Sequence, residues 1–444
     1  MASLFSLFTV LIITFINPIF TSALSQPPTP APPPIFMPTT PSTVPPGLFM
    51  SAVIFPQTFG VYLVGVAVGT PPVSQHMIMD TGSDVTWFEC KPCNCLQMPR
   101  IFDPLLSTSI SVVPCDSPTC DHFGCNNGQC TYEIEYMDGS FTKGVLMLET
   151  LTFGSTGVIN VVVGCGHSNN GFVNRANGLL GLGGGPLSLP SQLRLHGLAG
   201  IFSYCLPDSA QGSLGWLNFS LPSAMVHAGT AWIPLLRNPN KPTFYYVGLS
   251  GLGIGDVRLP IPENTFKLTK KGLGGVIIDS GTTYSHLPTP VYEIFRNAYV
   301  AKTVNILPRF SFEHPIFDTC FNLSGLESVQ VPNVSFFFSA GPILTLKKGN
   351  ILVQQELIFG ESIYCLAFVP TNYSISVIGS TQLAGIQTSF DTTAGYIGFG
   401  PNTCGTLENS PYCHGHWPPR SISLGNYILP NPFLLVCLFI CFYL

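Results

Sequence analysis

Residues 76–83 read HMIMDTGS, and residues 276–283 read VIIDSGTT. In both stretches a short apolar run ends in an aspartate, a hydroxyl residue, a glycine and a second hydroxyl residue. The apolar run predicts a buried strand, and the glycine allows the tight turn that follows it. One such loop is weak evidence, but two in a chain of similar halves predict that Asp80 and Asp279 are brought face to face. A pair of facing carboxylates is typical of acid–base hydrolysis.

The segments around these loops resemble the pepsin-like aspartic proteases, and specifically the nepenthesin-like plant group, over roughly residues 50–404. Matching segments occur in family order at 61–64, 69–72, 80–87, 136–140, 164–166, 178–182, 187–193, 244–247, 279–283 and 377–379. The resemblance implies a mainly all-β, bilobal acid protease fold with a central cleft. It also implies an endopeptidase that works at acid pH on protein or peptide substrates, with Asp80 and Asp279 as its catalytic residues and with no cofactor or metal.

In this family a hairpin flap closes over the substrate and carries a tyrosine. The resemblance assigns that role, and substrate binding, to Tyr136. Met137 stands where the family usually has a glycine, and Trp87 stands where the family has a tryptophan that partners the flap tyrosine. His286, just beyond the second acid loop, is interpreted as an ordinary loop histidine, with a place at the edge of a substrate subsite as the alternative.

The length and composition indicate an extracellular protein of two lobes. A chain of 444 residues is long enough for two domains with cores of their own. Charged residues make up only 9% of the chain, and the net charge is −5. The sequence has no basic patch that would indicate a nucleic-acid partner. We expect a monomer.

The 15 cysteines favour disulfides in a secreted chain. Seven of them cluster in an insertion at 90–130, and Cys90 and Cys93 have the spacing of half a zinc site. No second pair follows at the spacing of a zinc finger, so disulfides are the preferred interpretation. Twelve cysteines, by the resemblance, stand at family positions: Cys90, Cys93, Cys95, Cys115, Cys120, Cys125, Cys130, Cys165, Cys205, Cys320, Cys365 and Cys404. Connectivity is open, although Cys320 and Cys365 are natural mates within the second half.

The chain divides into five predicted parts. They are a signal peptide at 1–25, a proline-rich prosegment or linker at 26–50, an N-terminal lobe at 51–237, a C-terminal lobe at 238–405, and a spacer with a hydrophobic tail at 406–444. The alternative for the first part is a membrane helix, but Asn17-Pro18 interrupts the apolar run and leaves it short for spanning.

The tail predicts attachment to the outer face of the plasma membrane. Residues 433–444 form an uninterrupted apolar run that is too short to span a bilayer, and a polar spacer at 414–426 precedes it. This is the outline of a signal for a glycolipid (GPI) anchor, and the alternative is an uncleaved tail on a secreted or vacuolar protein. Glycosylation sequons at Asn218, Asn322, Asn333 and Asn372 fit an extracellular glycoprotein wherever the asparagine is exposed.

Most of the chain predicts short strands separated by glycine-rich turns. The clearest helix follows the second acid loop, where Val291, Ile294, Phe295 and Ala298 recur at helical spacing. A shorter helix is predicted at 190–196. Two other functions remain open for a chain of this pattern. One is a catalytically weak binding or inhibitor protein on the same fold, and the other is a very selective processing enzyme.

Overall fold

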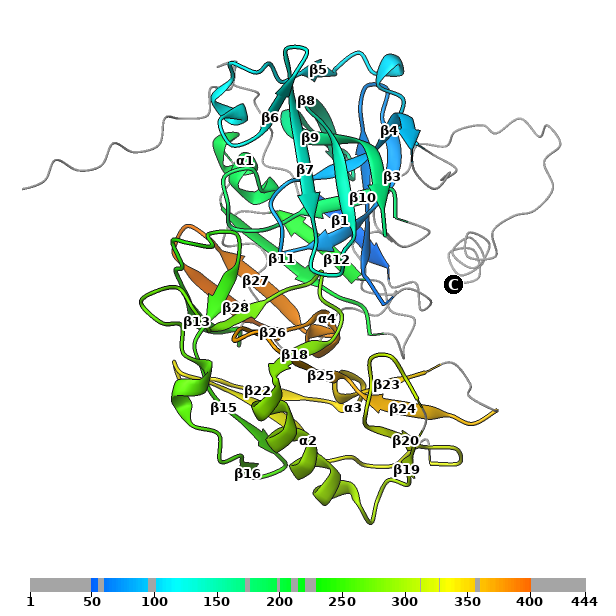
Figure 1. The fold of residues 1–444 in the computed structure, drawn as a ribbon, viewed down its shortest axis with the longest axis vertical. Coiled ribbons are helices and arrows are strands. Elements are labelled where there is room, and N and C mark those ends of the chain that lie inside the picture. The colour runs from blue at the N-terminus through cyan, green and yellow to red at the C-terminus, as the bar shows by residue number, and fades with distance from the viewer. Residues whose placement is uncertain are drawn as a thin grey trace, which may run out of the picture.

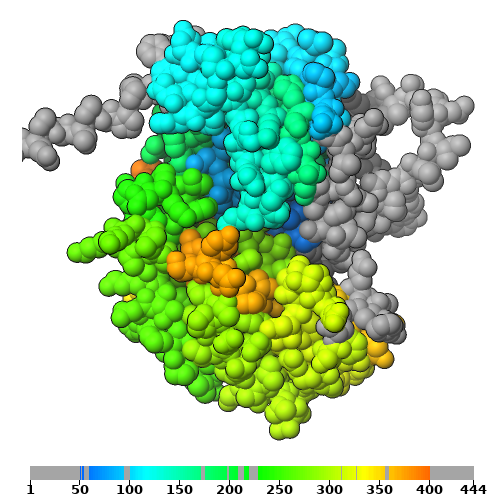
Figure 2. All heavy atoms as spheres, in the orientation of Figure 1, coloured from blue at the N-terminus to red at the C-terminus, as the bar shows by residue number. Residues whose placement is uncertain are grey.

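The structure is a computed structural model that describes residues 49–54, 60–94, 101–171, 176–197, 200–208, 215–219, 229–311, 313–326, 328–355 and 360–400. The predicted signal peptide, the spacer and the hydrophobic tail lie outside the described residues, as do all but the last two residues of the proline-rich part. Two lobes built mainly of strands lie one above the other (Figure 1). Figure 2 shows them in contact along their inner sides. The prediction of a bilobal, mainly β fold is confirmed.

The N-terminal lobe is built around a long hairpin and the strands that pair beside it. Its strands are β2 (Leu63–Val68), β3 (Val73–Asp80), β4 (Trp87–Asn94), β5 (Ser111–Val112), β6 (Gly124–Asn126), β7 (Gln129–Glu135), β8 (Phe141–Phe153), β9 (Thr156–Asn170) and β10 (Gly178–Gly181). Strands β8 and β9 form the long hairpin, and β4 runs parallel to β9. Apolar side chains such as Val64, Met77 and Val163 are fully buried, and they form the core that holds β3 in place.

Six antiparallel strands, three from each half of the chain, join the lobes. They pair in the order β1 (Phe49–Ile54), β12 (Gly215–Phe219), β11 (Ile201–Cys205), β27 (Gln387–Asp391), β28 (Tyr396–Phe399) and β13 (Ala231–Leu236). Phe202 of β11 stacks on Phe390 of β27, with ring centroids 4.6 Å apart. Since both rings are fully buried, this contact is part of a core that the two halves share.

The C-terminal lobe contributes thirteen further described strands. They are β14 (Tyr245–Val247), β15 (Leu249–Ile254), β16 (Val257–Arg258), β17 (Val276–Ile278), β18 (Ser285–Pro288), β19 (Arg309–Phe310), β20 (Cys320–Asn322), β21 (Val334–Phe338), β22 (Ile343–Leu346), β23 (Leu352–Gln354), β24 (Ile363–Leu366), β25 (Phe368–Thr371) and β26 (Ser376–Ile378). Two four-stranded sheets, β16-β15-β21-β22 and β19-β20-β24-β23, stand apart from the strands that carry the second acid loop.

Both predicted helices are present. They are α1 (Leu189–Leu195) and α2 (Thr289–Thr303), and the described residues add two short helices, α3 (Lys348–Ile351) and α4 (Ser380–Leu383). The buried face of α2 includes Val291 and Phe295, as the sequence pattern indicates. Ile294 is instead exposed, because the helix turns Tyr292 and Tyr299 toward the core.

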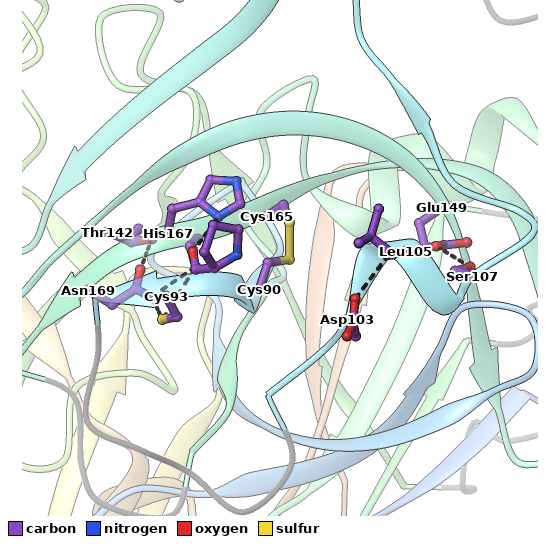
Figure 3. Close-up of a disulfide and its surroundings, with 12 residues drawn as sticks. Cys90, Cys93, Asp103, Leu105, Ser107, Thr142, Glu149, Cys165, His167 and Asn169 are labelled. Carbon is purple, nitrogen blue, oxygen red and sulfur yellow. Dashed lines mark hydrogen bonds between the residues drawn. A yellow bond between two sulfur atoms is a disulfide. The ribbon is translucent and has the colours of Figure 1, made fainter.

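Disulfides hold the N-terminal lobe at several points. Cys90 of β4 is bonded to Cys165 of β9, and Figure 3 shows this bridge beside the segment that carries Asp103 and Leu105. The same view shows Glu149, a fully buried carboxylate that accepts a hydrogen bond of 2.7 Å from the Ser107 hydroxyl. The loop around Ser107 is thereby fixed onto β8.

Candidate active site

The two halves present Asp80 and Asp279 in the same local arrangement. Asp80 ends β3, which lies between the antiparallel strand β2 and the parallel strand β10. Asp279 follows β17, which lies between the antiparallel strand β14 and the parallel strand β26. A strand with a neighbour on each side is rigid, so each aspartate leaves its strand from a fixed position.

Reciprocal hydrogen bonds join the two acid loops across the lobes. The backbone N–H of Thr81 donates to the Ser280 hydroxyl at 3.1 Å, and the backbone N–H of Ser280 donates to the Thr81 hydroxyl at 2.9 Å. Each hydroxyl in turn donates to a carbonyl of the opposite acid strand, Ser280 to Met79 and Thr81 to Ile278. Because all four bonds are buried, they fix the position of one loop relative to the other.

Each carboxyl group is oriented by its own loop. Asp80 accepts from the backbone N–H of Gly82 at 2.8 Å and from the Ser83 hydroxyl. Asp279 accepts from the backbone N–H of Gly281 at 2.9 Å and from the Thr282 hydroxyl at 2.7 Å. The hydroxyl residue after each glycine therefore orients the acid of its own loop.

The two glycines let the carboxyl groups approach each other. A Cβ atom added at Gly82 would lie 2.8 Å from Oδ2 of Asp279, and one added at Gly281 would lie 2.3 Å from Oδ1 of Asp80. Any larger residue at either position would collide with the opposite aspartate. The structure therefore brings together the two acids that the sequence paired.

Burial and charge act together on Asp80. Its side chain is only 6% exposed, and burial raises the pKa of the carboxyl well above its usual range. The charge of Asp279, and a hydrogen bond between the two carboxyls, raise this pKa further, whereas the hydrogen bonds from Ser83 and Gly82 lower it. Two carboxyls this close hold one proton between them over a range of acid pH. Such a pair can remove a proton from water with one member and donate a hydrogen bond to a carbonyl with the other.

Tyr136 lies at the turn of the β7–β8 hairpin. Its backbone N–H donates to the Ser140 carbonyl at 2.8 Å, and Gly139 takes the positive φ of +81° that closes the turn. The indole N–H of the buried Trp87 donates to the Tyr136 hydroxyl at 2.8 Å, so the pairing implied by the family resemblance is confirmed. Burial, followed by the charge of Asp80, raises the pKa of Tyr136 above its usual value. Met137, the next residue, is 75% exposed.

Two family models and several curated relatives match most of this chain. It matches the model described as xylanase inhibitor N-terminal over residues 62–219 and the one described as xylanase inhibitor C-terminal over residues 244–401. It is 48% identical over 353 residues to Protein ASPARTIC PROTEASE IN GUARD CELL 2 of Arabidopsis thaliana, a match that covers 78% of this chain and 73% of the relative. It is 39% identical over 354 residues to aspartic proteinase nepenthesin-2 of Nepenthes gracilis, with 78% of each chain covered. The chain belongs to the plant pepsin-like aspartic proteases.

Solved structures show the same fold at lower sequence identity. The protease matches the crystal structure titled edgp with a TM-score of 0.66 and 20% identity, over 82% of this chain and 96% of that one. It matches basic 7S globulin from soybean with a TM-score of 0.65 and 21% identity, over 82% and 98% of the two chains. As a member of its family, the protein is an aspartic-type endopeptidase that acts on protein or peptide substrates.

The structure describes four disulfides in this protease. They join Cys90 to Cys165, Cys115 to Cys125, Cys120 to Cys130, and Cys320 to Cys365, the pair expected within the second half. Bridges of this kind form in an oxidising compartment such as the secretory pathway. No group of His, Cys, Asp and Glu in the described part of the chain is arranged to hold a metal ion. In the same part, no helix is long and apolar enough to cross a membrane.

Sequence reasoning missed one partly buried acid in the first loop of the protease. Asp84 accepts a hydrogen bond of 2.9 Å from the backbone N–H of Gly185 and one of 2.7 Å from the Thr243 hydroxyl. Burial raises its pKa, and these two hydrogen bonds lower it. Asp84 thus ties the first acid loop to the segment that leads into the C-terminal lobe. The glycines at 183–185 were a signal for it, since Asp84 fills the space that a side chain at Gly185 would need.

Proposed function

We propose that this protein is a secreted endopeptidase that hydrolyses peptide bonds at acid pH with Asp80 and Asp279 as a catalytic dyad. The ionised member of the pair removes a proton from a water molecule, which then attacks the scissile carbonyl. The protonated member donates a hydrogen bond to the carbonyl oxygen and stabilises the charge that develops there. The observation that carries the proposal is the close approach of the two carboxyls, each held by its own loop.

Tyr136 has a supporting role in this proposal. The β7–β8 hairpin closes over the substrate, and Tyr136 excludes water from the reacting centre. Its hydrogen bond to Trp87 and its electrostatic interaction with Asp80 support this position for the flap. The exposed Met137 adds apolar surface at the end of the hairpin.

A second candidate function is a catalytically weak binding or inhibitor protein. The descriptions of the two matching family models, which name xylanase inhibitors, favour it. Both acid loops of this chain nevertheless keep their aspartate, glycine and hydroxyl residues, and both carboxyls are fully hydrogen-bonded by them. This favours the enzyme.

The direct test is an assay of the purified mature chain on a denatured protein across about pH 2 to 7. We expect a bell-shaped dependence of rate on pH with its maximum on the acid side of neutrality, and full inhibition by pepstatin. Absence of cleavage at every pH, in a chain that unfolds cooperatively, would support the binding protein instead.

We also propose that the mature enzyme is a monomer held on the outer face of the plasma membrane by a glycolipid that replaces the C-terminal apolar run. The supporting features are the length of the run at 433–444 and the spacer before it. Phosphatidylinositol-specific phospholipase C should release the enzyme from intact cells, and a chain that lacks residues 427–444 should enter the medium in active form. Recovery of mature protein that still carries Leu444 would contradict the anchor.

A further inference from the structure

His286 lies on the half-buried face of β18, close to the second acid loop. Along this strand Ser285 and Leu287 are 1% and 2% exposed, whereas Tyr284 and His286 are only partly buried. Side chains alternate between the two faces of a strand. Ser285 and Leu287 therefore face the core, and His286 faces the other way.

The strand register places His286 on the same side as Asp279. His286 pairs with Val377 of β26, and Val377 in turn pairs with Ile277 of β17. Paired residues in adjacent strands point to the same face, and Asp279 lies two residues after Ile277, which is again the same face. The charge of Asp279 accordingly acts on His286. Tyr136 has the corresponding relation to Asp80 in the other lobe.

No hydrogen bond within the described part of the chain engages the imidazole of His286. Burial lowers the pKa of the ring, and the charge of Asp279 raises it. Strands β25 and β26, which flank β18, contain no ionisable side chain. Helix α2, which also packs against β18, carries Glu293 on its exposed side and Arg296 in an ion pair with Asp318. Among the described residues, Asp279 is thus the charged group that acts on the ring.

We propose that His286 is a specificity-determining residue that selects substrates with an acidic side chain close to the scissile bond. The proposal rests on the function proposed above, because Asp279 marks the reacting centre only if the dyad is catalytic. A substrate held between the two lobes presents the side chains next to its scissile bond to the residues beside each aspartate. A protonated imidazole donates a charge-assisted hydrogen bond to a carboxylate, which an uncharged amide or an apolar group cannot match.

The pH range of this preference follows from the two titrating partners. The carboxyl of a substrate glutamate ionises above about pH 4.3, and an unperturbed histidine loses its charge above about pH 6.5. Because burial favours the neutral ring, His286 loses its charge below that upper limit. The preference is therefore greatest near about pH 5 and smaller on either side.

Two peptide series that differ only by Glu or Gln test the proposal. One series places the variable residue at successive positions before the scissile bond, and the other places it after the bond. The value of kcat/KM is measured for wild type, for His286→Asn and for His122→Asn. His122 is an exposed histidine of the cysteine-rich insertion and serves as the matched control.

For wild type and His122→Asn we expect about a 1.5- to fivefold preference for Glu over Gln at one position at about pH 5, the range for one partly exposed charge pair. The preference should fall close to one at about pH 3, where the substrate carboxyl is protonated, and His286→Asn should remove it at both pH values. Cleavage of the Gln peptides by all three proteins shows that each variant is folded and active. A wild-type ratio of one at every position, or a preference that His286→Asn retains, would overturn the proposal.

The design separates this inference from the proposed function. If wild type cleaves neither series nor a denatured protein, the proposed function fails. If wild type cleaves the Gln peptides without a preference for Glu, only the inference fails. Should His286→Asn not fold, His286→Gln takes its place, and the wild-type ratio is measured from about pH 3 to 7. A wild-type Glu preference that does not change with pH overturns the assignment to a histidine.

Discussion

Glu89→Gln should raise the free energy of unfolding at about pH 8 and leave it nearly unchanged at about pH 4. Glu89 is 7% exposed, and its Oε2 atom has no hydrogen-bond partner among the described residues. Burial raises the pKa of this carboxyl from 4.5 to about 7. The uncharged acid is therefore the form that the folded chain accommodates.

The direction of the effect follows from proton binding. Below pH 4.5 the carboxyl is protonated in both the folded and the unfolded chain, so it contributes no pH dependence. Between pH 4.5 and about 7 the unfolded chain releases the proton while the folded chain keeps it, and stability falls as the pH rises. Above about pH 7 the folded chain carries a buried charge. The difference between the pKa values of the unfolded and folded chain corresponds to at most about 3 kcal/mol in the free energy of unfolding. Because water has partial access to the carboxyl, we expect about 1–3 kcal/mol.

Urea unfolding at the two pH values measures this effect. The Asp279→Asn background prevents self-digestion, and Glu135→Gln, at an exposed position of β7, is the matched control. We expect Glu89→Gln to gain about 1–3 kcal/mol over its parent at pH 8 and less than about 0.5 kcal/mol at pH 4, with no such difference for Glu135→Gln. An equal change in stability at both pH values would refute the argument that a buried, unpaired acid sets this pH dependence.

Three further predictions concern the flap, the disulfides and the glycans. Tyr136→Phe removes the hydroxyl that accepts the hydrogen bond from Trp87 and should lower kcat by about fivefold. Tyr136→Ala should lower kcat by more than about tenfold. An unchanged kcat for Tyr136→Ala would mean that the flap is elsewhere. Removing the Cys320–Cys365 bridge, with its sequence separation of 45, should cost about 4 kcal/mol in urea unfolding. Removing the Cys115–Cys125 bridge, with a separation of 10, should cost about 3 kcal/mol, because a bridge that closes a shorter loop removes less entropy from the unfolded chain. The reverse order of the two costs would contradict this reasoning. Asn333→Gln and Asn372→Gln should each lower the apparent mass of the glycoprotein on a gel, because both asparagines are exposed. Asn218→Gln should leave the apparent mass unchanged, since Asn218 is 1% exposed. A glycan on Asn218 would contradict its burial in β12.

The acid loops were predictable because their signal is local. An apolar strand, an aspartate, a glycine and two hydroxyl residues specify the turn, and its repetition specifies the pairing of Asp80 with Asp279. The reciprocal bonds between Thr81 and Ser280 were not predictable in this way, because they depend on how the two lobes meet.

The burial of some side chains and the pairing of the cysteines were also not predictable from the sequence. A glutamate inside a strand predicts an exposed face, yet Glu89 is buried. Ile294 fits the apolar pattern of α2, but the larger rings of Tyr292 and Tyr299 take the core face. In the cysteine-rich insertion, Cys125 and Cys130 face each other across the β6–β7 hairpin, and each is bonded to a different cysteine. Only the three-dimensional structure shows which cysteines of this insertion are bonded to each other. The division at residues 237 and 238 stays a prediction.

The central claim is that Asp80 and Asp279 act together on the peptide bond, and the turnover of Asp80→Asn and Asp279→Asn tests it most directly. Asparagine has nearly the same shape as aspartate, but it cannot take a proton from water or share one with its partner. Both purified variants should unfold like the wild type, and each should lose at least about 10³-fold in kcat on a denatured protein at acid pH. Clear turnover by both folded variants would contradict the account.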